Sequence, residues 1–585
     1  MLLRRVEIES FRGLRSAVVD FDPTTALIGE NSAGKTTLLD AIAICLSGRD
    51  DRARLEVRDF HQSGDSAPSE RLSITLTFEE VAGEWREHAY AAFVPFVSTD
   101  PAGRRSMRFE VVGTRDPRGN AVDAQWAFGA GQGGRSMGQA PGLLAEWRRL
   151  SPMLRLRANR YVEQDPRGDG AERSDAGTDT TVASDPVARQ LEQQIRLVYD
   201  RLTGAADIGE DELHRGLEAA ESYLAIRSPY RRAPVSQLPP LMSELAETPI
   251  QAGRRPDTLL SSIKQGTGTR GLALIALIGA ILEARQRHAP DEEAQPLIVL
   301  EDVEAHLHPT TLAAMWRLIE TLPTQKIVTT NSGELLAAVP LRSIRRIVTD
   351  CRGTRVYRVD SDRYSVDDLR RIAYHVRINR AGALFARCWL FVEGETEAWL
   401  LPELAQICGY DFPAEGIRCV EFAQSGLRAL LRLANDLGIE WHLLTDGDEA
   451  GHAYVASASG HLNGRSPSDR ITRLEDRDIE HCLFYNGYAG LYRELAGQPI
   501  PGPRGRRMRE KATGIIRRAI HARSKPSLAL AVLEAAKRPG APGVPRELRT
   551  VIDTTVRLAR PPVESGAIGE ATGVRAGTRR RRTLA

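Results

Sequence analysis

Gly29-Glu30-Asn31-Ser32-Ala33-Gly34-Lys35-Thr36 is the stretch that decides the fold of this 585-residue chain. It has the spacing GxxxxGK(S/T) of a phosphate-binding loop. The apolar residues 26–28 before it are typical of a strand, and residues 37–46 after it are typical of a helix. Backbone N–H groups of such a loop face phosphates, Lys35 can reach the outer phosphates, and Thr36 can hold Mg²⁺. The residues from Gly29 to Thr37 therefore predict a nucleotide site, with ATP or GTP as the ligand.

Composition sets broad limits on the class of protein. With 42% hydrophobic and 27% charged residues, a chain of this length is expected to form two or more globular domains. A net charge of +2 gives no general indication of a nucleic-acid partner. The sequence has no run of about 18 apolar residues and no signal-peptide core, so we expect a cytoplasmic protein that does not engage a membrane.

Stretches typical of strands and helices alternate along both halves of the sequence, which predicts α/β domains with parallel sheets. The polar composition of residues 164–185 predicts a disordered stretch inside a long insert. The predicted segments are a P-loop ATPase head (1–48 and 258–350), a partly helical insert that is a candidate dimerisation region (49–257), a connector (351–385), a second α/β domain (386–545) and a flexible basic tail (546–585).

A strand-like run at residues 297–300 leads into Glu301 and Asp302 and looks like the Walker B strand of the ABC class of ATPases. This resemblance implies that Glu301 supports Mg²⁺ through water and that Asp302 polarises the attacking water. Gly266 and Gly268, at the start of an apolar helix pattern, resemble the ABC signature loop. In that family the signature loop of one subunit covers the nucleotide of another, so the resemblance implies a homodimer or a higher homo-oligomer.

Two residues depart from the ABC pattern. Asp302 is one methylene shorter than the usual glutamate, and Asn331 occupies the position of the switch-loop histidine. Because an amide cannot accept and pass on a proton, we expect slow ATP hydrolysis, with nucleotide controlling a conformation. The nearby pair His306 and His308 suggests a metal site, but a helix beginning at Pro309 explains it better. Residues 1–48, with Phe11-Arg12-Gly13, are similar to heads of the RecF and SMC type.

Acidic residues follow two further strand-like stretches. Glu393 comes directly after residues 389–392, and Asp446 and Asp448 follow residues 441–445. Because parallel strands bring their carboxyl ends to one edge of a sheet, these carboxylates should converge. Clustered carboxylates are costly without a cation, which favours Mg²⁺ or Mn²⁺. Either stretch alone is explained better by helix-dipole or turn residues than by a metal site.

Together and in this order, the two stretches resemble a TOPRIM domain with a Rossmann-like fold. A RecF/SMC-like ABC head with an insert, followed by TOPRIM, is similar to the overcoming-lysogenization-defect (OLD) family of ATP-dependent endonucleases, which includes the Gabija nuclease subunit. Asp478-Ile479-Glu480 and Lys525 match later motifs of that family. The resemblance implies that two metals are held by carboxylates, and that Lys525 offsets charge on the phosphate being cleaved. The implied metal ligands are Glu393, Glu397, Asp446, Asp448 and Glu480.

The sequence therefore predicts an ATP-binding, metal-dependent DNA endonuclease, with Glu393, Asp446, Asp448, Lys525 and Asp302 as its catalytic residues. One alternative is a non-nucleolytic RecF/SMC-like DNA-binding ATPase of DNA repair. A topoisomerase or primase is a weaker alternative, since neither a strand-passage tyrosine region nor primase zinc ligands are recognisable. A helicase encoded nearby would be a candidate partner and would suggest antiphage defence.

Overall fold

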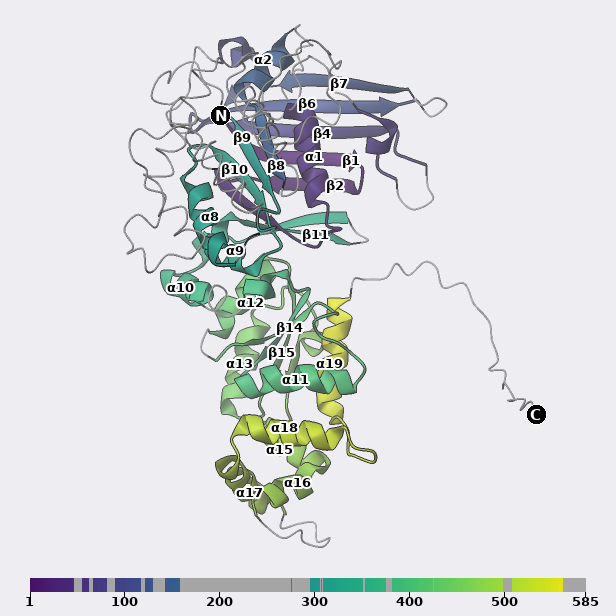
Figure 1. The fold of residues 1–585 in the computed structure, drawn as a ribbon, viewed down its shortest axis with the longest axis vertical. Coiled ribbons are helices and arrows are strands. Elements are labelled where there is room, and N and C mark those ends of the chain that lie inside the picture. Colours follow the sequence, from purple (N-terminus) through teal and green to yellow (C-terminus); the bar gives the residue numbers. More distant parts are fainter. Residues whose placement is uncertain are drawn as a thin grey trace, which may run out of the picture.

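The computed structural model describes an elongated molecule with a head, residues 1–374, above a C-terminal domain, residues 381–560 (Figure 1). Residues 158–274, which include the predicted disordered stretch, Gly266 and Gly268, lie outside the described residues, as do His306 and His308. The described residues are 1–46, 55–62, 67–81, 90–116, 121–129, 142–157, 275, 295–305, 307, 309–350, 353–374, 381–423, 426–497 and 508–560.

A six-stranded sheet carries the phosphate-binding loop at its centre. Its order is β12-β11-β3-β10-β9-β8, parallel except for β12. Alternate residues of β3 face opposite cores: Leu27 packs with α1, whereas Ala26 and Ile28 pack with α8 and α9. Burial on both faces explains the continuous apolar runs at residues 26–28 and 297–300 of this sheet. The bounds are β3 (Thr24–Ile28), β8 (Met153–Arg157), β9 (Leu297–Glu301), β10 (Gln325–Thr329), β11 (Ile344–Asp350), β12 (Gly353–Arg358), α1 (Lys35–Leu46), α8 (Pro309–Thr321) and α9 (Gly333–Ala338).

A second, antiparallel sheet with the order β2-β1-β4-β6-β5, and β7 paired to β6, packs in the same core as α1. The predicted boundary at residue 49 is therefore wrong, because β4 to β8 and α2 belong to the head rather than to an insert. The edge of β1 that faces away from β2 pairs with β4, a long-range contact that local sequence does not specify. The bounds are β1 (Leu2–Phe11), β2 (Leu14–Asp20), β4 (Arg71–Glu79), β5 (Val97–Thr99), β6 (Arg105–Arg115), β7 (Val122–Gly129), α2 (Leu143–Leu150), and the short helices Val57–Asp59 and Ala91–Phe96.

The C-terminal domain is built on a four-stranded parallel sheet, β14-β13-β15-β16, covered by helices (Figure 1). Its strands are β13 (Cys388–Val392), β14 (Ile417–Glu421), β15 (Glu440–Thr445) and β16 (Ile471–Arg473). Its helices are α11 (Glu395–Ile407), α12 (Leu427–Asp436), α13 (Glu449–Ser459), α14 (Pro467–Arg470), α15 (Ile479–Leu483), the π-helical turn Phe484–Tyr488, α16 (Ala489–Leu495), α17 (Met508–Ala522), α18 (Lys525–Ala536) and α19 (Arg546–Ala559).

The predicted flexible tail is wrong for residues 546–560. These residues form α19, which contacts β13, β14 and β15. Leu548, Val551, Ile552 and Val556 recur at helical spacing and are buried in the core of the C-terminal domain. This amphipathic pattern anchors the helix even though its other face is charged. Residues 561–585, with the predicted basic run, lie outside the described residues.

The head and the C-terminal domain share a buried apolar cluster, which runs from Ile28 and Trp316 in the head to Trp389 and Trp441. The short helices at this junction are α10 (Val366–Tyr374) and the turns Leu341–Ser343, Ser361–Arg363 and Ala381–Phe385. Arg346 of β11 is also buried and donates hydrogen bonds from its guanidinium to the carbonyls of Leu437, Gly438 and Ala386. The two parts are therefore docked firmly.

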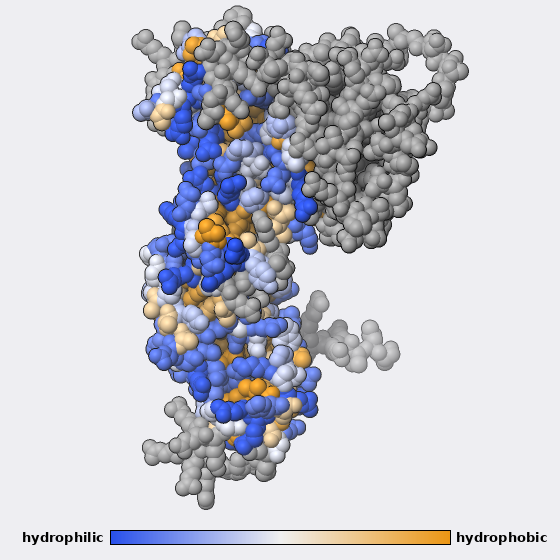
Figure 2. Space-filling view, turned by 90° about the vertical axis from the view of Figure 1, so that its left-hand side faces the viewer, coloured by the Kyte–Doolittle hydropathy of each residue, from blue (hydrophilic) through white to orange (hydrophobic). Residues whose placement is uncertain are grey.

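The surface gives no sign of a large apolar interface in the view of Figure 2, where the described residues are mostly hydrophilic and the orange areas are small and separate. Single exposed apolar side chains such as Trp399 and Leu530 are normal for a globular protein. The predicted homo-oligomer therefore stays a prediction. Within the described ranges, every helix is too short or too polar to cross a membrane.

Candidate functional sites

The phosphate-binding loop joins the carboxyl end of β3 to the start of α1, as predicted. Gly29 and Gly34 have φ angles of +150° and +88°. A Cβ atom at Gly29 would lie 2.4 Å from the carbonyl oxygen of Ile347, and one at Gly34 would lie 2.6 Å from Cδ2 of Leu14. Both positions therefore require glycine, for its backbone freedom and for the space.

Lys35 is held by the loop itself. Its ammonium donates hydrogen bonds to the carbonyl oxygens of Gly29 and Glu30, the latter at 3.1 Å, and lies 3.4 Å from Oδ1 of Asn331. Burial lowers the pKa of Lys35, and the carboxylates of Asp302, Glu304 and Glu30 oppose that shift. A bound phosphate would compete with these carbonyl groups for the ammonium.

The predicted Walker B residues lie beside the loop, because β9 and β10 end at the same edge as β3. Glu301 is buried at the end of β9, and Asp302 has a φ angle of +47°, unusual for a residue other than glycine. The backbone N–H of Asp302 donates to Oγ1 of Thr329 at 3.1 Å. Nδ2 of Asn331 donates to Oδ1 of Asp302 at 3.5 Å. Asn331 thus bridges Lys35 and Asp302.

Arg155 on β8 was missed by the sequence analysis. Its guanidinium pairs with the carboxylate of Glu301 and, at 2.6 Å, with Oδ1 of Asp40 on α1. Arg12 in turn joins Asp40 to the buried carboxylate of Asp59. No local motif marks Arg155, because arginine is abundant in this chain and the pairing depends on β8 lying next to β9. The network orients the carboxylate predicted to support Mg²⁺.

In the C-terminal domain, Glu393 and Asp446 follow the neighbouring parallel strands β13 and β15. The backbone N–H of Asp446 donates to Oε1 of Glu393 at 2.8 Å. Asp448 is the N-cap of α13, and its Oδ1 accepts from the N–H of Gly451 at 2.9 Å. The structure therefore brings these three predicted residues to one edge of the sheet, as parallel strands require.

Two further predicted ligands reach the same region from helices. Glu397 is buried in the first turn of α11, and a Cβ atom at Gly394 would lie 2.8 Å from its Oε2. Glu480 is buried at the start of α15, 2.9 Å from Nζ of Lys525 at the start of α18. Although burial lowers the pKa of Lys525, the hydrogen bond to Glu480 and its charge raise it overall. Lys525 is thus a cation beside the acidic group.

His481 was not predicted, yet it fixes the helix that carries Glu480. Its Nδ1 lies 2.6 Å from Oδ1 of Asp478, the N-cap of α15, and its Nε2 lies 3.1 Å from Oγ1 of Thr513 on α17. Both contacts are partly buried. The Asp478-Ile479-Glu480 motif therefore combines a helix cap with an inward-facing carboxylate.

Burial dominates the electrostatics of the C-terminal site, and repulsion between its carboxylates adds to it. Burial, followed by the charges of Glu393 and Glu397, raises the pKa of Asp446 from 3.8 to about 8. Burial also raises the pKa of Glu393 and Glu397, each of which is close to further carboxylates. An all-carboxylate donor set suits Mg²⁺ or Mn²⁺ chemically. Among the residues that the structure describes, however, no three such side chains are already arranged around a metal position.

A stability measurement can test the raised pKa of Asp446. Since the pKa of Asp446 is raised by folding, its favourable contribution is complete below the pKa of the unfolded chain and is lost as the pH rises through about 8. In EDTA at pH 8 we therefore expect Asp446→Asn to melt higher than the wild type, by about 2–4 °C per kcal/mol. The difference should shrink at pH 6 and when Mg²⁺ or Mn²⁺ is added. Equal melting temperatures at both pH values would contradict the raised pKa.

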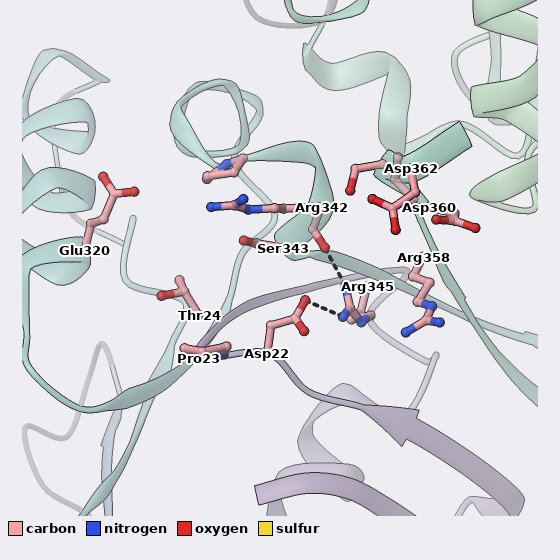
Figure 3. Close-up of a pocket in the computed structure, with 13 residues that line it drawn as sticks. Asp22, Pro23, Thr24, Glu320, Arg342, Ser343, Arg345, Arg358, Asp360 and Asp362 are labelled. Carbon is pink, nitrogen blue, oxygen red and sulfur yellow. Dashed lines mark hydrogen bonds and ion pairs between the residues drawn. The ribbon is translucent and has the colours of Figure 1, made fainter. Parts of the chain in front are cut away.

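A cavity of about 480 Å³ lies elsewhere in the head, at the amino ends of β3 and β11 and therefore opposite the phosphate-binding loop (Figure 3). Two of its charged groups pair with each other, since Nη2 of Arg345 lies 2.7 Å from Oδ2 of Asp22, and Nη1 of Arg345 donates to the carbonyl of Arg342 (Figure 3). The cavity contains none of the predicted site residues. We do not assign it to the predicted chemistry.

Comparison with known proteins identifies both parts of the chain. Residues 1–383 match the family model "Protein of unknown function (DUF2813)", and residues 384–448 match the model "Overcoming lysogenization defect protein-like, TOPRIM domain". The uncharacterized protein YbjD of Escherichia coli K12 is 34% identical, over 96% of this chain and 99% of YbjD. The chain belongs to the DUF2813 family and carries an OLD-like TOPRIM domain.

This DUF2813 protein is also 22% identical to the Old nuclease of Escherichia phage P2, over 76% of the chain and 77% of the nuclease. A solved structure of an SMC head bound to the C-terminal winged-helix domain of ScpA is also similar, with 16% identity and a TM-score of 0.37. The match spans 61% of this chain and 98% of the SMC head. The predicted OLD resemblance and the fold class, an ATPase head followed by TOPRIM, are confirmed. The roles of individual residues stay predictions.

Proposed function

We propose that this protein is an ATP-binding, metal-dependent DNA endonuclease of the OLD type, in which nucleotide regulates cleavage. The observation that carries the proposal is the gathering of Glu393, Asp446 and Asp448 at one edge of a TOPRIM sheet, in the same chain as a complete phosphate-binding loop. The likeness to the Old nuclease supports a nuclease family. The OLD-like TOPRIM model supports the use of a divalent metal.

The residues divide into metal ligands and a phosphate contact. Glu393, Asp446 and Asp448 would hold one divalent cation, and Glu397 and Glu480 would help to hold a second. When bound, such ions activate water and stabilise the leaving oxygen in phosphodiester hydrolysis. Lys525 keeps its charge beside Glu480 and can offset the negative charge that develops on the phosphate.

A plasmid-nicking assay tests the nuclease proposal directly. We expect the purified protein to convert supercoiled DNA to open-circular or linear DNA with Mg²⁺ or Mn²⁺, and to lose this activity in EDTA. Parallel reactions with and without ATP measure how nucleotide changes the rate. Failure to cleave with either metal, while ATP is still bound, would favour the alternative of a non-nucleolytic RecF/SMC-like DNA-binding ATPase.

The ATP half of the proposal depends on Lys35. Because its ammonium is partly buried and positioned in the loop, Lys35→Ala should weaken ATP binding by about 10- to 100-fold, the effect of losing a charge-assisted contact. Fluorescent-ATP titration measures this change. Lys537→Ala is the control, since Lys537 is an exposed cation paired with Glu403 in the other domain. An unchanged affinity in Lys35→Ala would exclude the loop as the nucleotide site.

We further propose that the active form is a homodimer or higher homo-oligomer acting on DNA in the cytoplasm. The head-to-tail nucleotide sandwich implied by the ABC resemblance supports the oligomer, and the nuclease likeness supports DNA as the substrate. The slow ATP hydrolysis expected from Asp302 and Asn331 fits a regulatory nucleotide better than a motor. Light scattering with and without ATP would test the assembly. A helicase partner and a role in antiphage defence stay predictions.

A further inference from the structure

One ion pair joins the phosphate-binding loop to the TOPRIM domain. The carboxylate of Glu30, the second residue of the loop, accepts two hydrogen bonds from Arg387: Nε lies 2.5 Å from Oε1, and Nη2 lies 2.9 Å from Oε2. The side-chain hydrogen bond to Arg387 lowers the pKa of Glu30, and the same contact raises the pKa of Arg387. Both groups are therefore charged, and the pair has the two-pronged geometry that fixes direction.

The backbone of Arg387 is tied to the strands that carry the predicted metal ligands. Arg387 directly precedes β13, which leads to Glu393, and its carbonyl oxygen accepts a hydrogen bond at 2.9 Å from the N–H of Glu440. Glu440 is the first residue of β15, which leads to Asp446. With about 3.3 Å per residue, each strand spans roughly 17–20 Å from this end to its acidic end. Arg387 is thus bonded to the first residue of each strand, covalently in β13 and by a hydrogen bond in β15.

On the other side of the ion pair, Glu30 is in contact with Lys35, the residue predicted to bind the nucleotide phosphates. Its carbonyl oxygen accepts a hydrogen bond from Nζ of Lys35, the group that a phosphate would draw away. The charge of Lys35 also helps to lower the pKa of the Glu30 carboxyl group. Binding of nucleotide therefore changes both the hydrogen bonding and the electric field at Glu30.

Docking of the two parts does not depend on this pair. The side chains of Arg387 and Glu30 are 39% and 49% exposed, and exposed ion pairs contribute little to stability. The buried guanidinium of Arg346 and the shared apolar cluster hold the domains together. The Glu30–Arg387 pair can therefore be made or broken at small cost, as a switchable contact requires.

We propose that Arg387 is a positioning residue that passes the nucleotide state of the loop, through Glu30, to the strands bearing Glu393 and Asp446. The inference rests on the proposed function and names the path of its regulation. The contact biases the relative placement of β13 and β15, and with it the carboxylates at their far ends. If nucleotide changes the affinity of the TOPRIM site for its ligands by some factor, linkage requires those ligands to change nucleotide affinity by the same factor.

The test compares full-length wild type with Arg387→Gln and Arg387→Lys. Supercoiled-plasmid nicking with Mn²⁺ is measured with and without saturating ATP, and fluorescent-ATP affinity is measured with and without a short DNA duplex in Ca²⁺. Two ratios follow: the nicking rate with ATP over that without, and the ATP affinity with DNA over that without. In the wild type we expect each ratio to differ from one by about fivefold or more, in either direction. In Arg387→Gln both ratios should fall to within about twofold of one, while nucleotide-free cleavage stays within about threefold of wild type. Arg387→Lys, which keeps the charge but not the two-pronged contact, should be intermediate.

Arg149→Gln is the matched control. Arg149 makes an equally two-pronged, half-exposed pair with Glu146, but within α2 of the head. The two ratios measured on Arg149→Gln should equal those of the wild type. The inference is overturned if Arg387→Gln keeps the wild-type ratios, or if the wild type cleaves DNA with no response to ATP. A wild type that cleaves with neither metal removes the proposed nuclease function itself, a result seen before any variant is compared.

Discussion

Asp446→Asn should abolish metal-dependent nicking, with a loss of about 10²–10³-fold or more, the usual cost of removing one group that stabilises the transition state. Asparagine keeps the size of the side chain, and the backbone N–H that donates to Glu393 is unaffected. The variant therefore removes a carboxylate oxygen that a bound cation would use and keeps the backbone contact to Glu393. Since Asp446 lies in the TOPRIM domain, ATP binding by the loop should be unchanged.

Asp411→Asn is the control for this experiment, because Asp411 is an exposed aspartate of the same domain, outside the acidic edge. The measurement is the initial rate of nicking across a range of Mg²⁺ and Mn²⁺ concentrations, together with fluorescent-ATP affinity. If Asp446→Asn cleaved at the wild-type rate at every metal concentration, the TOPRIM carboxylates would not be the catalytic centre. A defect rescued fully by more metal would instead assign Asp446 to metal affinity alone.

The parts of the fold that sequence predicts are those specified by neighbouring residues. The loop from Gly29 to Gly34 lies between β3 and α1 because its glycines and its flanking apolar run act locally. The sequence predicts β9, β13 and β15 for the same reason, since each is a short, mostly apolar run buried on both faces. Once these strands are parallel, the convergence of Glu393 and Asp446 follows from topology.

The missed features depend on pairings between distant residues. Arg155 meets Glu301 only because β8 lies beside β9, and β4 joins the head only because it pairs with β1. The Glu30–Arg387 contact spans 357 positions and lies between two domains. None of these has a local periodicity or motif. α19 is different, because its apolar spacing was present in the sequence but was outweighed by the basic residues around it.

Gly451→Ala should both destabilise the C-terminal domain and disable the acidic edge. A Cβ atom at Gly451 would lie 1.9 Å from the carbonyl oxygen of Asp446, so the backbone of Asp446 or of α13 has to move. Overpacking of this kind costs about 1–3 kcal/mol of the free energy of unfolding. The N–H of Gly451 also bonds Oδ1 of Asp448, so the shift displaces two predicted metal ligands. A displacement of about 1 Å can reduce a rate by about 10²-fold.

Gly490→Ala separates this effect from a general intolerance of glycine replacement. Gly490 lies in α16 of the same domain, and an added Cβ there meets no atom within 4 Å, so alanine should leave stability unchanged or raise it by about 0.4–1 kcal/mol. Urea unfolding and plasmid nicking are measured on both variants. If Gly451→Ala matched Gly490→Ala in stability and in cleavage, the close approach of α13 to the carbonyl of Asp446 would have no part in forming the site. A stable but inactive Gly451→Ala would show that the approach positions the ligands more than it supports the fold.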